Sequence, residues 1–63
     1  MKTTLKRAKE TAAEFSAAAP DLTVRVMDKC DKQSVVTASE AVYRERVLDG
    51  YVTVAIYKGG VQV

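Results

Sequence analysis

The first third of the chain carries apolar residues at helical spacing. Steps of three and four residues separate the members of one stripe, which are Leu5, Ala8, Ala12, Phe15 and Ala19. This spacing predicts an amphipathic helix over residues 3–19, and Pro20 ends it because a proline pushes the preceding residue out of the α region. Alanine dominates the stripe, so we expect Phe15 and Leu5 to be its bulky anchors. If Phe15 is buried, its replacement by Ala costs roughly 3–5 kcal/mol.

From residue 22 the pattern changes to alternation, which is typical of a half-buried strand. The apolar positions of this strand are Leu22, Val24 and Val26. A polar turn over residues 28–33 follows, and a second β-prone run occupies residues 34–37. Near the end, Lys58-Gly59-Gly60 predicts another turn before a three-residue tail. That tail forms either a short edge strand or a pairing across a dimer interface.

The longest β-prone pattern covers residues 42–57 and is interrupted by Asp49-Gly50. This dipeptide favours a two-residue type I′ turn, because Asp and Gly tolerate positive φ. In the hairpin that results, Leu48 faces Tyr51 and Val47 faces Val52. One face of the hairpin is then mostly apolar, and the other carries arginine and tyrosine.

A second helix near residues 38–49 is the alternative for the first arm of this hairpin. Residues 37–40 (Thr-Ala-Ser-Glu) fit a capping box, and Gly50 fits the position after a helix end. Against the helix, Val42 and Tyr43 prefer strands, and an apolar helical stripe would run through Glu45. The strand interpretation is therefore favoured. We expect one α+β domain over residues 1–63, with the N-terminal helix packed on a three-stranded antiparallel meander.

A chain of 63 residues is short for a self-sufficient hydrophobic core. It has one cysteine, Cys30, and no histidine, so neither an internal disulfide nor a zinc site can add stability. Self-association is the remaining common way for such a small domain to gain stability, and we expect a homodimer. A free thiol suits a reducing compartment, which points to the cytoplasm. No apolar run is long enough to span a membrane, and we expect no membrane partner.

Residues for catalysis are scarce. The chain lacks histidine, the commonest general base, and Cys30 has no second cysteine at a redox spacing. Asp28 and Asp31 lie close together but lack the further oxygen ligands of a calcium loop. We therefore expect a protein that is not an enzyme and that needs no metal or cofactor.

Basic and aromatic residues gather on the outward face of the predicted sheet, and the candidate partner-binding set is Arg25, Arg44, Arg46, Tyr51 and Tyr57. Such a face suits single-stranded nucleic acid, because the charges contact phosphates and the rings stack on bases. It also suits a protein partner, because Arg and Tyr are enriched at binding hot spots. A purely solvated sheet face has the same composition, and a dimer seam is a further alternative.

These observations favour a small non-catalytic interaction protein that binds and modulates or inhibits a larger protein or nucleoprotein complex. In size and simplicity alone, the chain resembles phage-encoded accessory proteins, including inhibitors of bacterial defence such as anti-CRISPRs. The alternative is a nucleic-acid-binding regulator that uses the basic, aromatic sheet face.

Overall fold

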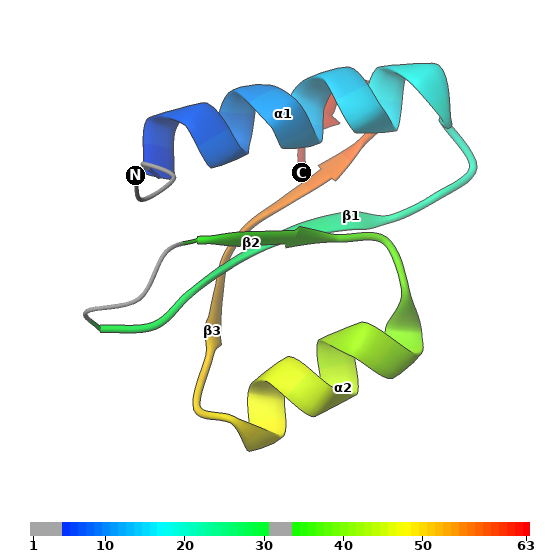
Figure 1. The fold of residues 1–63 in the computed structure, drawn as a ribbon. Helices are drawn as coiled ribbons and strands as arrows, with labels where there is room; N and C mark the ends of the chain where they lie inside the picture. The colour runs from blue at the N-terminus through cyan, green and yellow to red at the C-terminus, as the bar shows by residue number, and fades with distance from the viewer. Residues whose placement is uncertain (1–4, 31–33) are drawn as a thin grey trace.

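Two helices enclose a four-stranded sheet in the computed structural model, which describes residues 5–30 and 34–63. Along the chain the elements are α1 (Leu5–Ala18), β1 (Val24–Asp28), β2 (Val35–Thr37), α2 (Glu40–Leu48), β3 (Val52–Lys58) and β4 (Val61–Gln62). All pairings are antiparallel, in the order β2-β1-β3-β4. Figure 1 shows α1 on one side of the sheet and α2 on the other. The predicted α+β class is confirmed, whereas the three-stranded meander is replaced by four strands with a helix inserted between β2 and β3.

The helix α1 is confirmed, although its predicted start at residue 3 lies outside the described residues. Its buried positions are Ala8, Ala12 and Ser16, each four residues after the previous one. Phe15 is 43% exposed, so the expectation that it anchors the helix is wrong. Small side chains line the contact instead, and they allow the helix backbone to lie close to the sheet.

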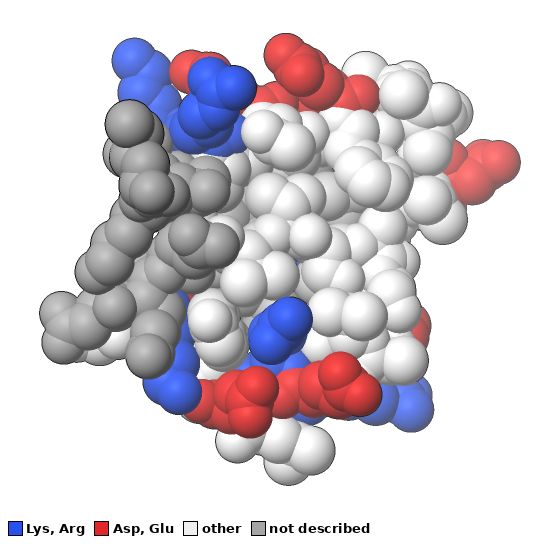
Figure 2. Space-filling model, viewed as in Figure 1, with Lys and Arg blue, Asp and Glu red and all other residues white. Residues whose placement is uncertain are grey.

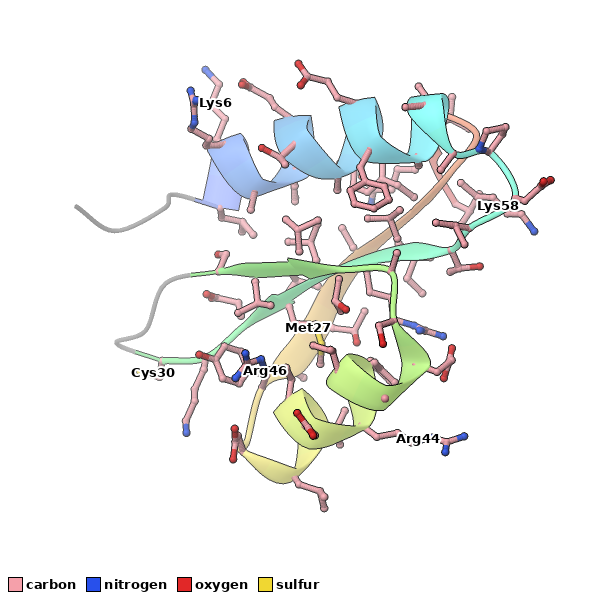
Figure 3. All side chains as sticks on the ribbon, turned by 45° about the vertical axis from the view of Figure 1, so that its right-hand side comes forward. Lys6, Met27, Cys30, Arg44, Arg46 and Lys58 are labelled. Atoms are coloured by element: carbon pink, nitrogen blue, oxygen red, sulfur yellow. The ribbon has the colours of Figure 1, made fainter. Side chains whose placement is uncertain are left out.

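The main core lies between α1 and the sheet. It consists of Ala8, Ala12, Val24, Val26, Ala55 and Tyr57. A β-bulge in the β1–β3 pairing separates Val26, which pairs with Ala55, from Met27, which pairs with Thr53. Met27 is fully buried, and Figure 3 shows it between the sheet and α2. The second face of the sheet is therefore covered as well, but by a much smaller core.

The turn between β3 and β4 is fastened to α1 by one buried serine. The Gly60 N–H donates to Ser16 Oγ at 3.0 Å, and the Ser16 hydroxyl donates to the Ala13 carbonyl at 3.1 Å. Gly60 has φ 87°, and a Cβ at this position would lie 3.1 Å from the Cβ of Ala17. Glycine is thus required by conformation and by space. The predicted edge strand at the tail is confirmed as β4, which pairs with Tyr57 and Lys58.

The predicted hairpin over residues 42–57 is wrong, and the alternative second helix is correct. Ser39 caps the start of α2, where its hydroxyl accepts the Val42 N–H at 3.4 Å. At the other end, the Gly50 N–H donates to the Val47 carbonyl at 3.0 Å and the Tyr51 N–H to the Arg46 carbonyl at 2.9 Å. These two bonds form a Schellman motif, which needs a positive φ at Gly50. The glycine that favoured a hairpin turn therefore ends a helix.

Candidate interaction surface

The five predicted binding residues do not form one face, because Arg44 and Arg46 lie on a helix and Tyr57 faces α1. Tyr57 lies on the opposite side, in the α1 core, and is 8% exposed. Its hydroxyl lies 3.4 Å from Gln62 Oε1, to which it donates. Figure 3 shows Arg44 and Arg46 on different sides of α2. The open basic, aromatic sheet face predicted from the sequence is therefore not formed.

Arg25 holds α2 against the sheet. Its guanidinium group lies 2.8 Å from the carboxylate of Glu40, and its Cζ lies 4.1 Å from the centre of the Tyr43 ring. Both partners belong to α2, whereas Arg25 belongs to β1. The Arg25 side chain is only 20% exposed. Its contacts are those of a structural residue, and little of the guanidinium group is left for an external partner.

Two cations lie near the ring of Tyr51 at the C-terminal end of α2. The Lys29 Nζ is 5.7 Å and the Arg46 Cζ is 5.8 Å from the centre of its ring. Lys29 also donates to the backbone carbonyl of Asp49, and Arg46 lies 3.8 Å from the Asp49 carboxylate. Positive groups at a helix C-terminus interact favourably with the helix dipole. This arrangement stabilises the end of α2, and the nearby carboxylate disfavours a bound anion.

One side of α2 carries an apolar groove that the hairpin interpretation missed. Its lining residues are Tyr43, Arg44, Val47 and Leu48, and its volume is about 280 Å³. Leu48 is 87% exposed and Val47 is 46% exposed. The helical spacing of four residues, from Tyr43 to Val47 and from Arg44 to Leu48, was the signal that could have found this α2 groove. On a strand, the same residues alternate between two faces and no groove is expected.

A second apolar feature is one edge of β3. The strand pairs with β1 along its length, but β4 pairs only with Tyr57 and Lys58 on the other side. Among the described residues no strand pairs with this side of residues 52–55, here called the β3 edge. Val52 is 64% and Val54 is 41% exposed there. Figure 2 shows charged side chains gathered along the two helical layers, with a largely uncharged band between them; β2 lies in front of β3 in this view (Figure 1), so the band is not the β3 edge.

The described residues contain no group of three or more His, Cys, Asp or Glu that could hold a metal ion. Cys30 is exposed and unpaired. Neither α1 nor α2, the helices of residues 5–30 and 34–63, is long and apolar enough to cross a membrane.

Comparisons with protein-family models, with curated proteins and with solved structures give no significant match. The surface features of this chain are therefore the basis for its functional assignment.

Proposed function

We propose that this chain is a small non-catalytic interaction protein that binds a larger protein, or the protein part of a nucleoprotein complex, through the α2 groove. The observation that carries the proposal is the exposure of Leu48 and Val47 beside Tyr43 and Arg44. Aliphatic side chains on a helix normally face the core, and burying a leucine completely contributes roughly 1.5–3 kcal/mol. Leu48 is exposed in the free chain, so it gains almost none of this stabilisation.

The exposure of the α2 groove favours a protein partner over a small molecule. Leu48 in its lining is 87% exposed, whereas small-molecule sites usually bury most of the ligand surface. The groove volume of about 280 Å³ accommodates an anchoring side chain of a partner. Tyr43 and Arg44 belong to the residue types that are enriched at protein interfaces, and they flank the aliphatic pair.

Modulation or inhibition by occupation of a partner's surface suits a chain of 63 residues, because such binding requires no catalytic group. Phage-type accessory and anti-defence proteins, including anti-CRISPR-like inhibitors, are the functional class to which we assign it by analogy of size and simplicity. Action in the cytoplasm as a homodimer is part of the same proposal. It rests on the free cysteine and on the small core.

Affinity capture from the native host tests this function with three tagged forms of the chain. The wild type should retain a specific partner, and Leu48→Glu should reduce retention at least about tenfold, because loss of an interface anchor costs more than about 1.4 kcal/mol. Leu22→Glu is the matched control, since Leu22 is also exposed but lies outside the α2 groove. Equal retention by the wild type and Leu48→Glu would exclude the α2 groove as the binding site. Absence of any specific partner would contradict the function itself.

A further inference from the structure

The β3 edge has unpaired backbone groups that are chemically ready to form hydrogen bonds. β4 consists of two residues, and the Val63 N–H extends its contact only as far as the Ile56 carbonyl, at 2.9 Å. Residues 52–55 continue β3 beyond this point without a partner on that side, within the described part of the chain. An open edge of this kind is a template for another strand.

Neither charge nor proline protects the open edge, although the β-bulge of the β1–β3 pairing lies at Val54 in the same segment. Soluble proteins commonly place lysine, proline or another charge on such strands, or cover them with a loop. The first six residues of β3 (Val-Thr-Val-Ala-Ile-Tyr) contain no charge and no proline. Val52 and Val54 expose their side chains along the β3 edge, and Val61 in β4 and Val63 directly after it are exposed as well. The edge therefore offers apolar contacts next to its hydrogen-bonding groups.

The chain has enough surface for an interface of ordinary size beside the α2 groove. Its accessible surface is 4285 Å². A standard interface covers about 800 Å² on each partner, which is roughly a fifth of this surface. Apolar side chains of the β3 edge and β4 provide a continuous starting point for such an interface.

We propose that the β3 edge is the seam of a homodimer, in which β3 of one copy pairs antiparallel with β3 of a second copy about a two-fold axis. A second copy fits because antiparallel pairing makes an uncharged strand complementary to itself, and because two identical patches meet in a two-fold interface. Since the unpaired segment spans residues 52–55, the axis passes at Thr53 or Val54. The two sheets then form one continuous eight-stranded sheet. This inference rests on the homodimer proposed above, but not on partner binding by the α2 groove.

Sedimentation equilibrium of the purified chain at tens of micromolar tests the seam. The wild type should have twice the mass of one chain, and the Val52→Lys/Val54→Lys double variant should dimerise at least about tenfold more weakly, because it places charges on the paired edge. Leu48→Glu should remain a dimer, which separates the seam from the α2 groove. Circular dichroism should show that the double variant keeps its helices. A monomeric wild type would overturn the homodimer and the seam together, while a double variant that still dimerises would overturn the seam alone.

Disulfide trapping provides a positive test of the register. In a Cys30→Ser background, either Thr53→Cys or Val54→Cys should cross-link two chains on mild oxidation, because a residue on the axis faces its own copy. Leu22→Cys in the same background is the control and should remain uncross-linked. If neither edge cysteine cross-links faster than this control, the antiparallel β3 pairing is wrong. Pairing of the β3 edge with a strand of a different protein, while the chain itself stays monomeric, would likewise overturn the proposal.

Discussion

Replacement of Arg25 by Ala should loosen α2 without unfolding the rest of the domain. The change removes an ion pair with Glu40 and a cation–π contact with Tyr43. The Glu40 side chain is 61% exposed, so the ion pair contributes at most about 1 kcal/mol. The partly desolvated cation–π contact adds roughly 0.5–1 kcal/mol. Because no residue of α2 is fully buried, the substitution should mainly lower the free energy of local opening of this helix, by about 1–2 kcal/mol.

Native-state hydrogen exchange measures this effect directly. In Arg25→Ala the amides of α2 should exchange roughly 5- to 30-fold faster, while those of α1 and of the β1–β3 pairing change much less. Arg44→Ala is the matched control, because it removes an exposed arginine of α2 itself. Double-mutant cycles of Arg25→Ala with Glu40→Gln and with Tyr43→Leu should each show a coupling energy of at least about 0.5 kcal/mol. If Arg25→Ala accelerates exchange no more than Arg44→Ala does, the assignment of Arg25 as the anchor of α2 is refuted.

Three further predictions concern the α1 contact and the surface charges. Ser16→Ala leaves the Gly60 N–H without its partner, so thermal denaturation should show that the free energy of unfolding falls by about 1–2 kcal/mol. An unchanged free energy of unfolding would argue against the buried hydrogen bond. Phe15→Ala should lower the free energy of unfolding by less than the roughly 3–5 kcal/mol expected for a buried phenylalanine, because this ring is 43% exposed. Urea denaturation measures this loss beside that of Ala12→Gly, a substitution in the buried stripe of α1. Fluorescence anisotropy should detect no binding of a labelled single-stranded oligonucleotide at physiological salt. Salt-dependent binding that is weakened in Arg44→Ala/Arg46→Ala would instead restore the nucleic-acid interpretation.

Residues 40–49 show where sequence reasoning reached its limit. The β-forming side chains of Val42, Tyr43 and Val47 favour a strand, whereas the Ser39 cap and the glycine at position 50 fit a helix. Gly50 adopts positive φ in either structure, so it does not distinguish them. The contacts of Arg25 with Glu40 and Tyr43 exist only when this segment is helical, and they connect residues that are far apart in sequence. Helix and strand propensities depend on neighbouring residues only, so they could not include these contacts.

The amino-acid sequence by itself determined the elements whose signals are local and agree with one another. Helical spacing followed by Pro20 defined α1, strict alternation defined β1, and the Gly59-Gly60 turn defined the short final strand. In each case neighbouring residues supply the physical constraint, so no knowledge of the distant chain is required.

Only the tertiary structure decided which side of each element is buried, and with it the candidate site. The hydrogen bond between Ser16 and Gly60 places serine, and not Phe15, against the sheet. The second helix covers Arg25 and exposes Leu48 in the α2 groove, while Tyr57 lies on the opposite face of the sheet, in the α1 core. Burial depends on contacts between surfaces, and these contacts join residues that are far apart in the sequence. The surfaces proposed to carry an interaction therefore follow from the packing of α2 and from the open edge of β3, and neither was contained in the sequence pattern.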